Sequence, residues 1–249
     1  MSSVLPTVPV LHSEWLKIRS LRGTVGSLAA VLAATAGIQA LVSATVGQAE
    51  ADNLGGDPLF WAFYGINFGQ VAAIAFGATA VSAEFHQGGL RTSLTAVPNR
   101  TRLYLSKIAV VAGLMFVVGQ LTGLATFLGG QALMGSYALD LGAPGTYRAV
   151  VGSGLYLMLM ALFAAGLTAV LRSAAVVLSL LIPFVLIASF VIGAAASSVG
   201  RYLPDQAGQV VLHQQATGSL GPWSGLAVTA LWAAAALGLG WLSLRRRDA

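Results

Sequence analysis

The side chains that could carry catalysis are few in this chain, and their spacing excludes several kinds of chemistry. Cysteine is absent, which excludes disulfides, cysteine-ligated metals and a cysteine nucleophile. The chain has only two lysines, Lys17 and Lys107, and neither follows the glycine pattern of a phosphate-binding loop. We therefore predict that the chain binds no metal or cofactor of its own and does not hydrolyse ATP by itself.

The remaining acid–base groups are badly placed for an intramembrane enzyme or an ion-coupled carrier. His12, His86 and His213 are the histidines, and all fall outside the long apolar stretches, so none can serve as the base for a nucleophile within them. Every Asp and Glu also lies outside those stretches or at their edges, which argues against a deep carboxylate that carries a coupling ion. Sodium coordination by backbone carbonyls stays open.

Neutral polar residues do occur inside the apolar stretches. They are Gln39, Asn67, Gln70, Gln120 and Thr126. Asn67 and Gln70 are three residues apart, so they share one face of a helix. Such residues either form hydrogen bonds between helices or line a weakly polar path for a substrate, and both interpretations stay open.

The composition of the chain indicates which secondary-structure elements carry these polar residues. With 57% hydrophobic and 8% charged residues, the chain has too little charge for a water-exposed surface, since soluble domains carry about 25%. Its uncharged runs exceed the roughly 20 residues that cross a hydrocarbon core. Because lipid cannot satisfy backbone N–H and C=O groups, these runs must be helices. The sequence predicts an all-α integral membrane protein with transmembrane helices at 24–46, 59–82, 108–133, 149–171, 174–196 and 223–244.

Several local features predict how these helices are connected and packed. Small residues spaced four apart predict close approach between helices; the pairs are Gly65–Gly69 and Gly119–Gly123. Pro183 predicts a kink or an irregular middle in the fifth helix. Only residues 172–173 join the fourth and fifth helices, which must therefore be antiparallel neighbours. The segment 197–222 is either a short helix at the membrane surface or an irregular loop.

The N-terminal residues form a separate predicted unit, 1–22, before the six-helix domain at 23–249. Residues 1–9 are expected to be a mobile tail, and 10–22 an interfacial helix. Its broad apolar face consists of Val10, Leu11, Trp15, Ile18 and Leu21. Trp15 and the flanking cations suit a lipid headgroup region, although Glu14 interrupts the apolar face. The alternative is a positively charged lead-in to the first helix.

The placement of positive charge predicts the orientation. Of the 13 Lys and Arg residues, all but Arg148 and Arg201 fall on one side of the membrane when the six helices alternate. Cytoplasmic segments carry the excess of Lys and Arg. Both termini are therefore predicted to be cytoplasmic, together with the connection 84–107.

The connection 84–107 is a charged interval between two apolar blocks. Gly88 and Gly89 should end the second helix, residues 90–96 could form a short helix along the membrane surface, and Pro98-Asn99 should turn the chain. Its cations are Arg91, Arg100, Arg102 and Lys107. These cations either belong to a surface that meets a partner or serve only as topology determinants.

This connection resembles the first cytoplasmic loop of type-2 ABC export permeases, a bacterial family with many actinobacterial members. The resemblance rests on Glu84-Phe85-x-x-Gly88-x-Leu90-Arg91-Thr92-x-Leu94, followed by Pro98-x-Arg100 and Lys107. The lead-in Glu14-Trp15-x-Lys17-x-Arg19 is similar to the family's N-terminal connecting helix, and Leu203-Pro204-x-x-Ala207-Gly208 and Arg245-Arg246-Arg247-Asp248 are similar to its later segments. The chain departs from the family pattern at Gly89, where Thr is frequent, and at His86, where Arg is frequent.

The resemblance implies a permease that lacks its own motor. A separate ATP-binding subunit, which holds ATP and Mg, would dock at the cytoplasmic side, and a second permease chain, identical or a sister, would complete the path. The permease would export a lipophilic drug, lipid or peptide across a bacterial plasma membrane. By the resemblance, the residues that contact the ATPase would be Glu14, Lys17, Arg19, Glu84, Phe85, Gly88, Leu90, Arg91, Leu94, Pro98 and Arg100. The alternative function is a six-span scaffold or assembly protein that transports nothing.

Overall fold

The computed structural model describes residues 7–20, 22–45, 57–85, 89, 93, 95, 97–134, 138–215 and 218–246. Within these ranges the regular structure is helical throughout, and no strand occurs. Six helices are long and apolar enough to cross a membrane, which confirms the predicted all-α fold with six spans. The spans are α2 (Arg22–Thr45), α5 (Ile66–Ser82) with η1 (Ala83–Phe85), α7 (Arg100–Ala132), α8 (Thr146–Leu171), α9–η3–α10 (Ala174–Pro183, Phe184–Ala188, Ser189–Ala195) and α13 (Pro222–Arg246).

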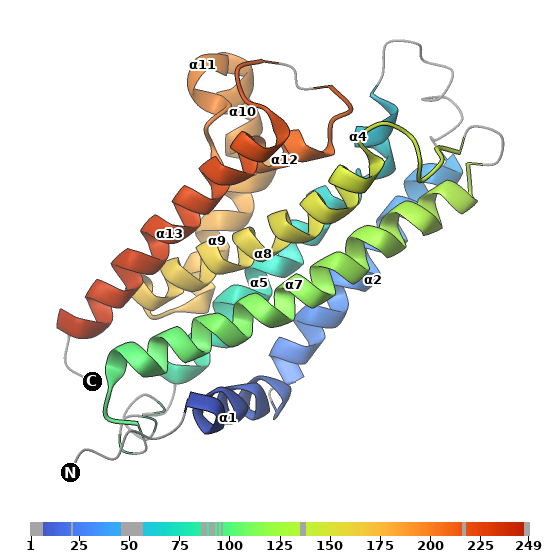
Figure 1. The fold of residues 1–249 in the computed structure, drawn as a ribbon. Coiled ribbons are helices and arrows are strands. Elements are labelled where there is room, and N and C mark those ends of the chain that lie inside the picture. The colour runs from blue at the N-terminus through green and yellow to red at the C-terminus, as the bar shows by residue number, and fades with distance from the viewer. Residues whose placement is uncertain are drawn as a thin grey trace.

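Helix α8 lies at the centre of the bundle (Figure 1). It packs against α5, α7 and α13, while α2 covers α5 and α7 from outside and α9 packs on α5. Helix α8 is accordingly the most buried of the six spans. It ends at Arg172, which is left-handed (φ 56°), and Ser173 then caps α9. This two-residue turn confirms that the fourth and fifth spans are antiparallel neighbours.

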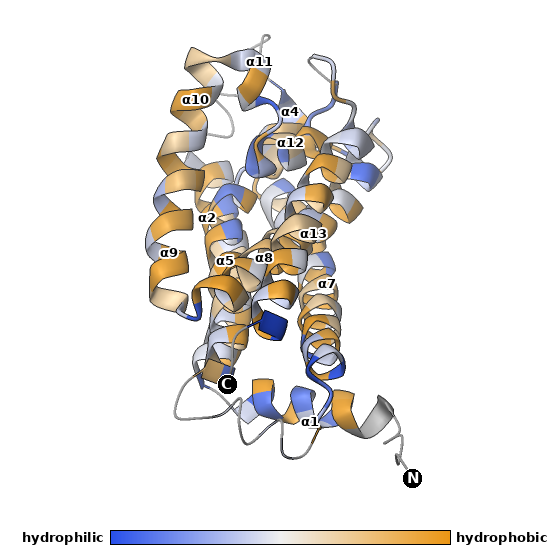
Figure 2. Ribbon diagram, turned by 90° about the vertical axis from the view of Figure 1, so that its left-hand side faces the viewer, coloured by the Kyte–Doolittle hydropathy of each residue, from blue (hydrophilic) through white to orange (hydrophobic). Residues whose placement is uncertain are grey.

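The outer surface of the bundle is apolar and its interior holds neutral polar groups. Large side chains such as Ile187 and Leu231 are 64% and 70% exposed, whereas Thr35, Gln70 and Thr122 are buried. Figure 2 shows hydrophobic residues along the outward faces of the long helices. A surface of this kind would be costly in water, but it suits contact with lipid chains.

Close helix packing occurs at glycines, as the small-residue pairs predict. A Cβ added to Gly119 would lie 2.8 Å from the carbonyl oxygen of Gly154, and one added to Gly123 would lie 2.3 Å from Oγ of Ser153. Gly77 approaches α8 even more closely, because an added Cβ would lie 2.0 Å from the carbonyl oxygen of Ala161. These contacts bring α5 and α7 against the central helix.

Two spans differ from the predicted ranges. The second is broken: α4 (Pro58–Ala62) precedes a turn at Phe63–Gly65, after which α5 begins. The third begins at Arg100, eight residues before the predicted start, because the Asn99 side chain accepts a hydrogen bond from the N–H of Arg102 and caps the helix. At 1.5 Å per residue, its 33 residues span about 50 Å, more than the roughly 30 Å hydrocarbon core.

Helix α1 (Thr7–Ser20) precedes α2 and crosses one end of the bundle (Figure 1). Its helical character confirms the predicted helix over residues 10–20, while its interfacial location stays a prediction. Its start at Thr7 corrects the expectation that 7–9 belong to a tail. Pro9 is tolerated because it lies in the first turn, where its missing N–H has no partner within the helix. We call this end of the bundle, where the last turn of α13 also lies, the α1 end. Its assignment to the cytoplasm stays a prediction.

The opposite end, which we call the α12 end, is closed by short helices. They are α11 (Ser197–Gly200), α12 (Pro204–Gln209) and η4 (Val210–Leu212). The prediction of a short helix within 197–222 is confirmed, although 201–203 and 213–215 are turns or bends, and the location of the segment at the membrane surface stays a prediction. Helix α12 contacts α8, α10 and α13. Pro183 is followed by the π-helical turn η3, which confirms the irregular middle predicted for the fifth span.

Asp205 of α12 is a buried carboxyl that holds this cap to the fifth span. Its Oδ1 accepts a hydrogen bond of 2.7 Å from the hydroxyl of Ser189, the residue that follows the π-helical turn. Burial raises the pKa of Asp205 above its ordinary value, although hydrogen bonds from Ser189 and from backbone N–H groups oppose the shift. The folded protein therefore favours the protonated form of the Asp205 carboxyl more than the unfolded chain does.

The Asp205→Asn variant should be less sensitive to pH than the wild type. A raised pKa means that the folded state holds the proton more firmly than the unfolded state, so the contribution of Asp205 to stability falls as pH rises from about 4 through the raised value. Asparagine can still accept the Ser189 hydrogen bond and carries no charge. Thermal unfolding midpoints measured over this pH window should therefore fall for the wild type relative to the variant. Parallel profiles would contradict the assignment.

Candidate coupling site

One face of α1 is buried against the α1 end of the bundle. Val10, Glu14 and Ile18 recur every four residues, which places them on one side of the helix, and all three are buried. Glu14 lies between the two apolar side chains with its own side chain only 1% exposed. A carboxylate in such a position must be paired.

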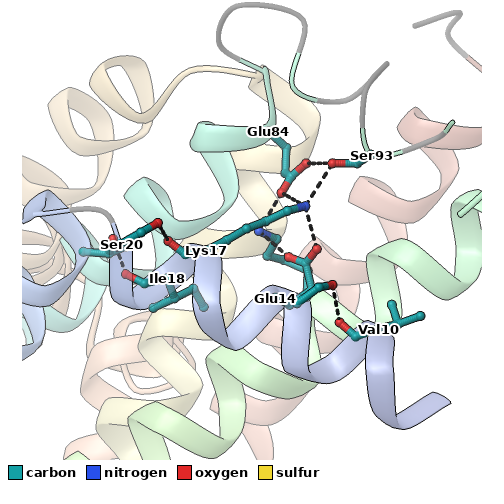
Figure 3. A network of polar contacts seen from close by, with 10 residues as sticks. Val10, Glu14, Lys17, Ile18, Ser20, Glu84 and Ser93 are labelled. Carbon is teal, nitrogen blue, oxygen red and sulfur yellow. Dashed lines mark hydrogen bonds and ion pairs between the residues drawn. The ribbon is translucent and has the colours of Figure 1, made fainter. Parts of the chain in front are cut away.

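The partners of Glu14 form a closed ring of alternating charges (Figure 3). Lys17 Nζ lies 2.7 Å from Glu14 and 3.1 Å from Glu84. Lys107 Nζ lies 2.5 Å from the other oxygen of Glu14 and 2.7 Å from Glu84. Ser93 closes one side, because it accepts from Lys17 at 2.9 Å and donates to Glu84 at 2.8 Å. We call these five residues the α1 network.

The α1 network balances its charges, with two carboxylates against two ammonium groups. Removing ions from water is costly, so a buried network of this kind adds little stability relative to apolar packing, but loss of one member leaves a buried charge unpaired. Each lysine bridges both glutamates, so no member can be removed without affecting all the others. The network therefore fixes a geometry more than it adds stability.

Lys17 remains charged under physiological conditions. Burial alone would lower its pKa, but the hydrogen bond with Glu14 and the charge of Glu84 outweigh that effect and raise the pKa above its ordinary value. While its carboxylate partners are ionised, Lys17 contributes this stabilisation below the ordinary lysine pKa, and the contribution is lost as pH rises through the raised pKa.

The α1 network joins three spans at one point. Glu14 and Lys17 belong to α1, which leads into α2; Glu84 belongs to η1, which continues α5; and Lys107 belongs to α7. A displacement of α1 or of the connection after η1 must therefore act on α2, α5 and α7 together. An open cavity of about 330 Å³ lies beside the network, lined in part by Ile18, Ser20 and Ala83.

Further contacts attach the neighbouring helices to the same end. Arg100 donates to the carbonyl of Leu244 at 3.0 Å, and Trp241 donates to the hydroxyl of Thr101 at 3.1 Å, so the start of α7 is held to the end of α13. The guanidinium of Arg172 lies 5.6 Å from the ring centroid of Phe85. The turn after α8 therefore rests on η1, and the α1 end forms one connected unit.

The residues predicted to contact the ATPase lie in different environments in the structure. Glu14, Lys17 and Glu84 face one another inside the α1 network, while Arg19 and Pro98 are exposed. Phe85 and Arg100 are half-buried and contact Arg172 and α13. Four of the predicted residues, and most of the short helix expected at 90–96, lie outside the described residues: Gly88, Leu90, Arg91 and Leu94. The role of these residues in docking stays a prediction.

Sequence reasoning missed the part that Lys107 plays. Its position in the charged connection suits a topology determinant or a partner contact, but its side chain is 6% exposed and pairs with both glutamates. A signal was present: Glu14 interrupts the apolar face of α1, and a carboxylate on a buried face requires a cation from elsewhere in the chain. With only one lysine outside α1, Lys107 was an available partner.

Four of the five polar residues predicted inside the spans form side-chain hydrogen bonds within the chain. Gln39 donates to the carbonyl of Trp61 and accepts from the N–H of Gly65, so it satisfies the backbone at the break between α4 and α5. Gln120 donates to the carbonyl of Val151 on α8, and Asn67 to that of Tyr64.

Two further polar span residues differ in their bonding. Gln70 accepts from the hydroxyl of Tyr156 on α8. The hydroxyl of Thr126 is buried without a hydrogen-bond partner among the described residues. The contacts of Gln39, Gln70 and Gln120 favour the interpretation that these residues join helices, while a role in a substrate path stays a prediction.

Comparison with known proteins agrees with this architecture. Residues 10–197 match the family model described as ABC-2 family transporter protein. The matched segment begins in α1 and ends at the start of α11, so it includes the α1 network and the first five spans. No curated protein matches the chain. The chain therefore belongs to the ABC-2 family of transporter proteins, in which it is a multi-span membrane permease.

Proposed function

We propose that this chain is the membrane-spanning subunit of an ATP-driven exporter in a bacterial plasma membrane. A separate ATP-binding subunit binds ATP and Mg and docks at the α1 end, which is then cytoplasmic. A second permease chain, identical or a sister, completes the translocation path. The substrate is lipophilic, because the outward faces of the spans are apolar and most of the polar span residues are used in hydrogen bonds within the chain.

The observation that carries this proposal is the α1 network. Membership of the family implies an ATP-binding partner, and ATP can change the permease only through contacts that differ between two states. The network is a rigid junction through which a push on α1 or on the 84–107 connection reaches three spans. The exposed residues beside it, such as Arg19 and Pro98, supply a surface for the partner. The network itself transmits the movement.

Copurification and ATP turnover test the proposal. The permease is purified in mild detergent together with a candidate ATP-binding subunit, and ATP hydrolysis is measured with and without the permease. We expect a stable complex whose turnover depends on the permease. Failure to copurify, together with unchanged turnover, would favour the scaffold or assembly alternative.

The Glu84→Gln variant should uncouple the two subunits. Glutamine leaves two ammonium groups facing the single carboxylate of Glu14, so the junction between η1, α1 and α7 loosens. We expect the dependence of ATP turnover on the permease to fall about fivefold or more, the usual size of coupling between sites, while the complex still forms. The exposed His12→Gln variant on α1 is the matched control. If ATP turnover depends on the Glu84→Gln permease as strongly as on the wild type, the α1 network has no part in coupling the two subunits.

A further inference from the structure

Two adjoining cavities lie at the α12 end, opposite the α1 network. The larger, of about 480 Å³, is lined by α10, α11 and α12, with Phe190, Ala194 and Ser197 among its residues. The smaller, of about 180 Å³, is lined by Val210, His213, Ser219 and Leu220. Arg201 and Gln206 line both cavities, so the two spaces meet at a guanidinium and an amide.

Arg201 gives this meeting point a positive charge. Its hydrogen bonds go to neutral oxygens, from Nε to the carbonyl of Ser198 at 3.1 Å and from a terminal nitrogen to the hydroxyl of Ser219 at 2.8 Å. No carboxylate within 4.0 Å of Arg201 occurs among the described residues. An exposed guanidinium held in place by neutral acceptors retains donors for an anion.

The two nearby carboxylates each have partners of their own. Asp205 accepts from the hydroxyl of Ser189 at 2.7 Å, and the amide of Gln206 donates to its other oxygen at 3.5 Å. Asp57 accepts from the ring of His213 at 3.0 Å and from backbone N–H groups of α4 and Gln214. Neither carboxylate is among the described residues that line the cavities. Among the described residues that line the cavities, Arg201 therefore carries the one full charge, and Gln206 and Ser219 add polar groups beside it.

An apolar stripe leads away from the larger cavity along the fifth span. Ile187, Phe190, Val191 and Ala194 are spaced at intervals of three and four, so they lie close to one face of η3 and α10. Phe190 is 70% exposed although it lines the cavity. In a spanning helix such a face meets lipid chains, so a polar, positive cavity opens directly onto an apolar surface.

We propose that this site binds an anionic amphiphile, with the charged head group at Arg201 and Gln206 and the chain along the stripe of Phe190. The proposal rests on the proposed function and deepens it, because it names the substrate class of the exporter. The volume of the two cavities agrees with this assignment. Together they suit a head group and the first carbons of its acyl chain, while the rest of the acyl chain stays in contact with lipid. A guanidinium can bind phosphate or carboxylate oxygens through paired donors.

Lipid retention by the purified, delipidated full chain tests the proposal without ATP or a partner. Phosphatidylglycerol and phosphatidylcholine of equal chain length are added, and bound lipid is counted by native mass spectrometry. We expect a preference for phosphatidylglycerol of about tenfold, the size of one charge-assisted hydrogen bond. Arg201→Gln should abolish the preference, and Arg201→Lys should keep part of it.

Two further variants serve as controls for the effect of charge and of the apolar stripe. Arg246→Gln removes the same charge at the exposed end of α13, far from the cavities, and should leave the preference intact. Phe190→Ser should lower retention of both lipids alike. Equal retention of both lipids by the wild type, or equal loss of preference in Arg246→Gln, overturns the proposal. So does displacement of phosphatidylglycerol by inorganic phosphate at equal concentration, which would indicate a site for free anions.

The measurement is independent of the test of the proposed function. Loss of copurification with the ATP-binding subunit would contradict the exporter assignment and leave lipid retention unchanged. If the permease still stimulates ATP turnover but shows no preference for phosphatidylglycerol, only the proposal that the site binds an anionic amphiphile is overturned.

Discussion

The Lys107→Met variant is expected to lose about 3 kcal/mol of stability, the usual cost of breaking a buried ion pair. Lys107 pairs with Glu14 at 2.5 Å and with Glu84 at 2.7 Å. Methionine fills much of the same space but leaves both carboxylates dependent on Lys17, which already donates to Ser93. The result is one uncompensated negative charge at a site where the Glu14 side chain is 1% exposed.

A double variant that restores the charge balance of the α1 network is the matched control. In Glu14→Gln/Lys107→Met the remaining pair, Lys17 and Glu84, is balanced, so the double variant should be more stable than Lys107→Met alone. Thermal unfolding in detergent, followed by intrinsic tryptophan fluorescence, measures the double variant and both single variants, Glu14→Gln and Lys107→Met. If the double variant unfolds at a temperature equal to that expected from adding the two single effects, the residues are not coupled, and the α1 network is not a unit.

The second large effect is expected at Gly77, where α5 meets α8. An alanine Cβ would lie 2.0 Å from the carbonyl oxygen of Ala161 and 2.8 Å from its carbonyl carbon. Backbone atoms cannot rotate away, so the two helices must separate. We expect Gly77→Ala to lose about 3 kcal/mol, the upper end of the range for overpacked sites, even though alanine favours a helix by about 1 kcal/mol.

Gly113→Ala on α7 is the control for Gly77→Ala, because an added Cβ there meets nothing within 4 Å. This variant should be as stable as the wild type or slightly more so, since only the gain in helix propensity remains. Size-exclusion profiles and thermal midpoints of both variants provide the comparison. Equal midpoints for Gly77→Ala and Gly113→Ala would mean that α5 and α8 do not depend on this close contact.

Gly77 and the α1 network affect different properties of the molecule. Gly77 sets how closely the spans pack in the middle of the bundle, whereas the α1 network sets how the bundle is attached to its N-terminal helix. A variant of Gly77 should therefore affect folding and insertion as a whole. A neutral variant of the network, such as Glu14→Gln/Lys107→Met, should leave the folded bundle intact and alter its response to the ATP-binding subunit.

The sequence alone determined the membrane fold and the number of spans. Apolar runs of more than about 20 residues leave no alternative to spanning helices, because lipid offers no hydrogen bonds to an open backbone. The short turn at Arg172 and Ser173, the irregular middle after Pro183 and the close approach at Gly119 also follow from local chemistry. Each depends on one or two residues near one another in the chain.

Only the tertiary structure decided how the charged residues at the α1 end are used. Glu14, Glu84 and Lys107 are far apart in sequence, and each one separately suits a surface contact or a topology signal. Their meeting depends on how α1 crosses α5 and α7, which no local pattern specifies. Because a buried carboxylate requires a cation, the position of Glu14 on the apolar face of α1 could have indicated an internal pair. The choice of Lys107 as its partner required the packed bundle.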